Sequence, residues 1–249
     1  MKDRNYLIIA IGIFLALFLH AYLIGSALQR FQKEVRYISV KGFAEKEVKA
    51  NLAVWNIKTK ITTNNLQEGS AEIESGKIKL VQFLLQKGIN KDEIIQMDLN
   101  VVDKVARDYG SNDIGAYRYI IENSLQVRSE NVENVQKVSR MDDELLKTGV
   151  VISNDQAYMG KVQYLFTKLN DIKPAMLTEA TKNAKKAALQ FSNESDVTLD
   201  NLRKANQGLF TIIDRDEFSS AQGDGGGYQN LNDINKKVRV VVSVDYYIK

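Results

Sequence analysis

The last part of the chain, 236–249, alternates apolar and polar side chains with a period of two. Its apolar set is Val238, Val240, Val242, Val244, Tyr246 and Ile248. Because successive side chains of a strand point to opposite faces, this alternation predicts a strand with one buried face. Segment 51–62 has a similar pattern and predicts a second strand. The positions that share a face there are Ala53, Trp55, Ile57, Thr59 and Ile61.

Shorter alternating segments predict further strands. They cover 36–41, 93–106, 116–128, 150–158 and 208–214. A turn rich in Asp, Gly, Ser and Asn separates 93–106 from 116–128, and this arrangement predicts a long hairpin. The polar segments 42–49 and 217–233 are expected to be connections between strands.

Three segments repeat apolar residues every three or four positions and predict helices. They cover 63–87, 131–148 and 171–191. The first begins with cap residues that include Asn65, and Gly88 stands where a helix usually ends. The third has small residues at Ala180, Ala184 and Ala188, which indicate close packing on a sheet. Strands and helices are mixed rather than strictly alternating. The order predicts an α+β fold: a mixed, mostly antiparallel sheet with helices packed on one face, preceded by an N-terminal transmembrane helix.

The N-terminal segment 6–28 contains no charged side chain. As a helix it would be about 34 Å long, enough to cross a hydrocarbon core of about 30 Å. A cleaved signal peptide is the alternative, with small residues at 25–27 as the cleavage site. The expected organisation is an anchor or signal segment at 1–28, a connector at 29–34 and an exported domain at 35–249.

Composition narrows the chemistry of this exported domain. The chain has no cysteine, and its single histidine, His20, lies in the apolar N-terminal segment. Disulfides, thiolate nucleophiles and imidazole-dependent hydrolysis are therefore excluded there. The net charge of +3 is spread along the chain, whereas a nucleic-acid-binding domain usually clusters its basic residues. We expect no catalytic residues, no metal, no cofactor and no nucleic acid partner.

Several polar and aromatic groups remain as candidate sites. Asp214, Asp216, Glu217 and Asp224 near the glycines at 223–227 could hold calcium, although the spacing is not that of an EF-hand; a solvated loop is the favoured interpretation. The acidic triplet 142–144 and the lysines 182, 185 and 186 are best explained as solvated surfaces, with attraction of these lysines to anionic lipid as the alternative. Trp55, Tyr117 and Tyr119 either pack in the core or, if exposed, form the natural contacts of a protein interface.

The order of short motifs resembles the SIMPL-domain family over 35–249. The motifs are Ile38–Val48, the helix end and strand at 85–94, Tyr117-Arg118-Tyr119, the Ala-rich helix 180–191 and the final valine strand. A departure from the family pattern is 192–196, where a Gly-containing turn is usual. The resemblance implies an α+β protein of the bacterial cell envelope that tends to self-associate, with a link to stress tolerance and no catalytic residue set to carry over.

We therefore expect a non-enzymatic protein of the bacterial inner membrane, spanning it once, with its C-terminal domain in the periplasm or outside. After signal cleavage it would instead be a soluble periplasmic protein. The expected partners are further copies of the chain or another envelope protein, together with the membrane. Two alternatives stay open: an exported hydrolase that uses carboxylates, and a periplasmic solute-binding module. Opposed carboxyl groups in a pocket would favour the former, and a deep apolar pocket the latter.

Overall fold

The computed structural model describes residues 12–24, 36–106, 116–153, 162–216 and 231–249. These residues fall into two compact units. Unit 1 contains 1–41, 184–206 and 243–249, and unit 2 contains 42–183 and 207–242. The predicted α+β class with mostly antiparallel pairing is confirmed, but the strands form two sheets instead of one.

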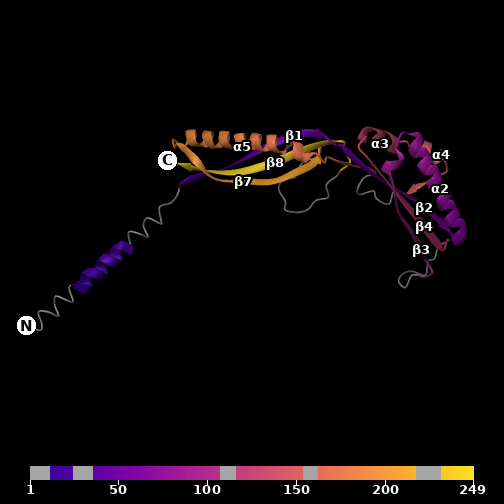
Figure 1. The fold of residues 1–249 in the computed structure, drawn as a ribbon, viewed down its shortest axis with the longest axis horizontal. Coiled ribbons are helices and arrows are strands. Elements are labelled where there is room, and N and C mark those ends of the chain that lie inside the picture. The colour runs from indigo at the N-terminus through magenta and orange to yellow at the C-terminus, as the bar shows by residue number, and fades with distance from the viewer. Residues whose placement is uncertain (1–11, 25–35, 107–115, 154–161, 217–230) are drawn as a thin grey trace, which may run out of the picture. The chain divides into compact units, whose positions relative to one another are not determined.

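The five-stranded sheet lies in unit 2. Its strands are β2 (Leu52–Thr63), β3 (Ile94–Asp103), β4 (Tyr119–Ser129), β5 (Ile152–Ser153) and β6 (Val162–Leu165). The order is β3-β4-β2-β5, with β6 also paired to β2. Figure 1 labels β2, β3 and β4 of this sheet. Each pairing of β2 and of β3 with its neighbour is antiparallel. The predicted hairpin 93–128 is therefore confirmed as β3 and β4, and its predicted turn, 107–115, lies outside the described residues.

Helices α2 (Leu66–Gln86), α3 (Val132–Ser139) and α4 (Asp142–Lys147) accompany this sheet, and a short 3-10 turn, η1 (Lys91–Glu93), precedes β3. The Asn65 side chain accepts hydrogen bonds from the first turn of α2, as its N-cap position requires. Gly88 follows this helix with φ of +81°, a conformation that glycine adopts without strain. Both ends of α2 thus agree with the sequence prediction.

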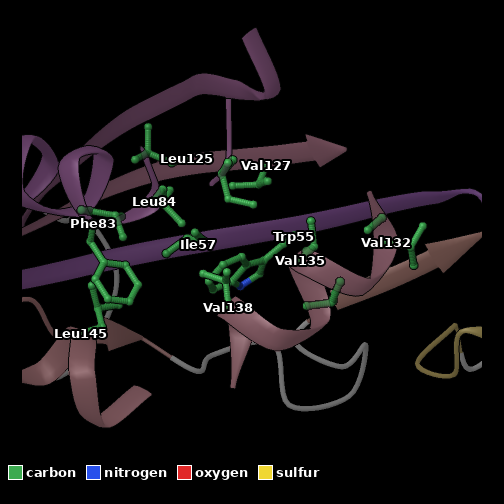
Figure 2. Close-up of a cluster of buried hydrophobic side chains, with 14 of the residues drawn as sticks. Trp55, Ile57, Phe83, Leu84, Leu125, Val127, Val132, Val135, Val138 and Leu145 are labelled. Carbon is green, nitrogen blue, oxygen red and sulfur yellow. The ribbon is translucent and has the colours of Figure 1, made fainter. Parts of the chain in front are cut away.

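A cluster of large apolar side chains fills the core of unit 2 (Figure 2). In the sheet, Trp55 of β2 lies opposite Val127 of β4 and Ile57 lies opposite Leu125, and all four are almost completely buried. The helices contribute Phe83 and Leu84 from α2, Val132, Val135 and Val138 from α3, and Leu145 from α4. Burial of such side chains is the main favourable contribution to folding.

The three-stranded sheet has the order β1-β8-β7, with β1 at Tyr37–Lys49, β7 at Leu199–Asp214 and β8 at Asn235–Ile248. Helix α5 (Leu169–Glu194) accompanies it (Figure 1). The predicted alanine stripe is confirmed, because Ala180, Ala184 and Ala188 are fully buried. The predicted valine face of the last strand is confirmed as well, since Val238, Val240, Val242 and Val244 are buried.

Two local predictions are wrong. Segment 42–49 is not a connection but continues β1, because Gly42 and Ala44 turn inward while Phe43 and Glu45 alternate with them on the exposed side. A strand whose outer face meets water can carry this many charges. The single helix expected at 131–148 is two helices, because the backbone leaves helical geometry at Met141 and restarts at the acidic residues 142–144. Acidic side chains favour the first turn of a helix.

Residues 12–24 form a helix with exposed side chains. Among the described residues, none of the helices combines the length and the apolar character that crossing a membrane requires.

A candidate protein interface on the β3–β4 hairpin

Strand β3 forms one edge of the five-stranded sheet, and a bulge divides it. Gln96 pairs with Leu125 and Leu99 pairs with Asn123, so Met97 and Asp98 together occupy the space opposite one residue of β4. The extra residue reverses the phase of side chains along the strand. Ile95 therefore points to one face of the sheet, whereas Leu99 and Val101 point to the other.

We use the name apolar strip for Ile95, Met97, Leu99 and Val101 of β3. These side chains are 40%, 43%, 56% and 44% exposed. Leu99 and Val101 lie opposite Asn123 and Ile121 in the sheet register, and the latter two are buried. Leu99 and Val101 are thus on the same face as the core but beyond the part of the sheet that α2 covers, because α2 packs on β2 and β4. Ile95 lies opposite Gln126, on the other face of the sheet.

The bulge also changes how this edge can be used. A regular edge strand offers a row of backbone donors and acceptors that a second strand can join. Here the ladder positions are interrupted in the middle of β3, and the exposed Asp98 adds a charge at the interruption. Side-chain packing on the apolar strip is consequently favoured over addition of a long strand.

A polar cluster around Arg118 lies at the end of the hairpin next to its predicted turn, a place that we call the hairpin base. The Arg118 guanidinium donates hydrogen bonds to both carboxylate oxygens of Asp103, at 2.8–3.2 Å, and lies 4.9 Å from the ring centroid of Tyr119. The Arg118 backbone N–H donates to the Asn64 side chain, and its carbonyl accepts from Lys104. The hydrogen bonds from the Arg118 guanidinium hold the pKa of Asp103 below its ordinary value.

The three aromatic residues singled out in the sequence occupy different environments. Tyr117 is 47% exposed, beside the hairpin base, and Tyr119 is half-buried against Arg118. Trp55 is 1% exposed and belongs to the core of unit 2 (Figure 2). The core alternative therefore describes Trp55, and a protein interface at Tyr117 and Tyr119 stays a prediction.

The acidic candidates have structural partners in the described residues. Asp214 is buried, and its carboxylate pairs with Nζ of Lys236, which is 0% exposed. The other carboxylate oxygen of Asp214 accepts hydrogen bonds from the backbone N–H groups of Asn232 and Asp233, at 2.9 and 3.1 Å. Asp216 pairs with Arg215. Asp214 thus fixes the turn that leads into β8 instead of offering free oxygen ligands.

The remaining candidates are surface groups or lie outside the described residues. Within the acidic triplet 142–144, Glu144 pairs with Lys87. Lysines 182, 185 and 186 are exposed on α5. Glu217, Asp224 and the glycines at 223–227 lie outside the described residues. A search of the described residues finds no group of three His, Cys, Asp or Glu side chains that could hold a metal ion.

Sequence reasoning missed the apolar strip and the buried ion pair. The alternation at 95, 97, 99 and 101 is visible in the sequence, but a period of two indicates one buried face, and a bulge leaves no composition signal here. Lys236 opens the last strand in phase with the buried valines, and this phase was the available signal for its burial.

Taken together, the fold and the hairpin define an α+β domain with antiparallel sheets whose candidate site is an apolar surface at a sheet edge. The chain belongs to the SIMPL family: the model of this family, described as a protein of unknown function (DUF541), matches residues 38–246. This range includes all of unit 2 and most of the residues of unit 1 from 36 onward. A search of the curated proteins finds no match.

Proposed function

We propose that this protein is a non-enzymatic component of the bacterial cell envelope, held in the inner membrane by its N-terminal segment, whose exported domain self-associates. The observation that carries self-association is the apolar strip of β3, with Tyr117 beside the hairpin base. Large apolar groups at the surface of a folded domain are typical of interaction sites. A second copy of the chain is the occupant that we propose.

The membrane part of the proposal rests on the sequence. Segment 6–28 is free of charge over a length that suits a bilayer, and residues 12–24 within it are helical. An anchored chain brings its copies together in two dimensions, which raises their effective concentration. A weak contact at the apolar strip would then suffice for assembly.

The carboxylate hydrolase is the weaker alternative. A general acid in such an enzyme needs a raised carboxyl pKa. Lys or Arg partners instead lower the pKa of five carboxyl groups: Asp103, Glu133, Glu144, Asp200 and Asp216. These groups are ionised at neutral pH and serve as partners in ion pairs. They support an interpretation in which these carboxylates form surface ion pairs and do not act as general acids.

The test is the molecular mass of the full chain in detergent, measured by light scattering on a size-exclusion column. After the mass of bound detergent is subtracted, we expect the protein mass of the particle to exceed the 28.1 kDa of one chain. The double variant Leu99→Glu/Val101→Glu places two charges on the apolar strip and should return the protein to monomers. Ile78→Glu is the matched control, because Ile78 is 49% exposed on α2, and it should leave the mass unchanged. A wild-type protein that is monomeric at high concentration would refute self-association.

A further inference from the structure

The end of unit 1 brings together segments that are distant in the sequence. The backbone N–H of Ile248 donates to the carbonyl of Arg36, and Lys249 exchanges two hydrogen bonds of 3.0 Å with Thr198. Ser192, near the end of α5, donates its hydroxyl to the carbonyl of Val197. The start of β1, the end of β8, the start of β7 and the end of α5 therefore form one surface, which we name the terminal face.

Aromatic and apolar side chains are exposed at and beside this terminal face. Tyr37 is 47% exposed, Phe191 58%, Leu189 42% and Tyr247 36%. Basic residues are exposed nearby: Arg36 and Lys249 at the strand ends, and Lys185 and Lys186 on α5 about two turns before it ends at Glu194. Side chains with an apolar body, combined with Lys and Arg, are the residue types that favour the headgroup layer of a membrane.

The charge balance of unit 1 has the sign that an anionic surface would attract. Its residues from 36 onward carry seven Lys and Arg against four Asp and Glu, a net charge of +3. Unit 2 carries 23 against 25, a net charge of −2. Asp245 and Asp200 are already paired, with Arg203 and Lys249. Glu194 and Asp196 are the remaining acidic side chains of the unit, and they are included in this balance.

The connection to the N-terminal segment limits where the terminal face can be. Residues 25–35 lie between the helical residues 12–24 and Arg36, the first described residue of unit 1 beyond them. Eleven residues span at most about 40 Å when fully extended. If segment 6–28 crosses the membrane, the terminal face stays within this distance of the lipid headgroups. Tethering of this kind gives a weak contact a high effective concentration.

From these observations we infer that the terminal face of unit 1 docks on anionic lipid headgroups, through Phe191 and Tyr37 together with Arg36, Lys185 and Lys186. The inference rests on the proposed function, because the anchor supplies the tether. Each basic residue near an anionic bilayer shifts the ratio of docked to free molecules about fivefold. Docking would fix the orientation of unit 1 on the membrane.

Because the chain has no cysteine, single labels can report on this contact. The full chain carrying Gln190→Cys, beside Phe191, is labelled with an environment-sensitive dye. It is reconstituted into vesicles of phosphatidylcholine alone or of equimolar phosphatidylcholine and phosphatidylglycerol. Gln86→Cys is the matched control, because Gln86 is also an exposed glutamine near the end of a helix, α2 of unit 2.

We expect the label at 190 to shift its emission to the blue and to resist an aqueous quencher in the vesicles that contain phosphatidylglycerol. In vesicles of phosphatidylcholine alone it should do neither. The label at 86 should be the same in both vesicles. High salt should reverse the effect because it screens charges. Lys185→Gln/Lys186→Gln should reduce the docked-to-free ratio about 25-fold, which is two fivefold steps. Lys137→Gln/Lys147→Gln, two exposed lysines of unit 2, is the control and should have no effect.

Equal signals at 190 in both vesicles would overturn the inference, and so would equal changes at 190 and 86. A change at 190 in both vesicles that appears only as the protein becomes crowded would indicate a second copy on this face, and would also overturn it. Extraction by alkaline carbonate tests the anchor separately. A protein that resists extraction with a silent label at 190 keeps the anchor and loses the docking. An extracted protein whose label still responds to phosphatidylglycerol keeps the docking and loses the anchor.

Discussion

The two sheets of this protein are packed by different kinds of side chain. The five-stranded sheet is covered by large apolar groups, with Trp55, Phe83 and Leu84 in contact in one cluster. The three-stranded sheet is packed by β-branched and small residues, with the valines of β8 on one side and the alanines of α5 on the other. These buried side chains are shorter than those of the five-stranded sheet.

This difference in packing determines which substitutions destabilise each sheet most. A core of large side chains loses most from truncation, because a removed ring leaves a cavity. A layer of alanine and valine has little to lose by truncation and is disturbed by added volume or by an unmatched polar group. The buried pair of Lys236 and Asp214 belongs to the second kind of packing, since charged residues are seldom fully buried unless they are paired.

The largest effect is expected at this ion pair. Asp214→Ala leaves the Lys236 ammonium buried without its partner and should lower the free energy of unfolding by about 3–5 kcal/mol. The measurement is urea unfolding of the full chain in detergent, followed by the fluorescence of the single tryptophan, Trp55.

The control for this prediction removes both charges. Asp214→Ala/Lys236→Met should recover most of the lost stability, because an apolar pair can replace a buried ion pair at little cost. If the double variant is as unstable as Asp214→Ala, the loss comes from the backbone hydrogen bonds of Asn232 and Asp233 and not from the unpaired charge.

A smaller effect is expected where α2 approaches the five-stranded sheet. A Cβ atom on Gly69 would lie 2.5 Å from Cγ2 of Thr63 and 2.8 Å from Cδ1 of Ile121. Gly69→Ala should therefore be destabilising, because overpacking costs about 1–3 kcal/mol and exceeds the helix-propensity gain of about 1 kcal/mol. Gly76→Ala is the matched control in the same helix, because a Cβ atom there would meet nothing within 4 Å apart from its chain neighbours and the backbone of its own helix.

Gly76→Ala should raise the free energy of unfolding by about 0.5–1 kcal/mol, since alanine favours the helix. The measurement is thermal unfolding of both variants and the wild type. The unfolding midpoint should fall for Gly69→Ala and rise for Gly76→Ala. Destabilisation by both substitutions would mean that α2 does not tolerate alanine for a reason other than its contact with the sheet.

The sequence predicted the regular packing of the three-stranded sheet better than its boundaries. The valines of β8 and the alanines of α5 were identified because each element keeps a single period along its length. The extension of β1 through 42–49 was missed, because charges on the exposed face of a strand look the same in the sequence as charges in a loop. The split of 131–148 into α3 and α4 was also missed, since the acidic residues that start the second helix suit a helix surface equally well.

The candidate interface was only partly predictable. The hairpin and its tyrosines follow from the alternating pattern. The exposure of Leu99 and Val101 depends on the bulge at Met97 and on the packing of α2 on β2 and β4. Both are tertiary properties. The partner of Asp214 was likewise invisible, because a salt bridge between residues 22 positions apart depends on the register of β7 and β8.

The smallest effect is expected at the hairpin base, where a polar contact lies at the surface of the five-stranded sheet. The hydrogen bonds from Arg118 lower the pKa of Asp103 below its ordinary value of 3.8. The stabilisation is therefore fully present above about pH 4 and is lost as the pH falls through the lower pKa of the folded state. The amide of Lys104, which donates to Arg118 at 3.0 Å, is the probe. At neutral pH, the amide hydrogen of Lys104 should exchange with deuterium faster in the Asp103→Asn variant than in the wild type. Below the folded pKa of Asp103 the exchange rates of the two proteins, each corrected for the intrinsic pH dependence, should converge. A difference that persists at low pH would mean that Asp103 does not act on this contact through its charge.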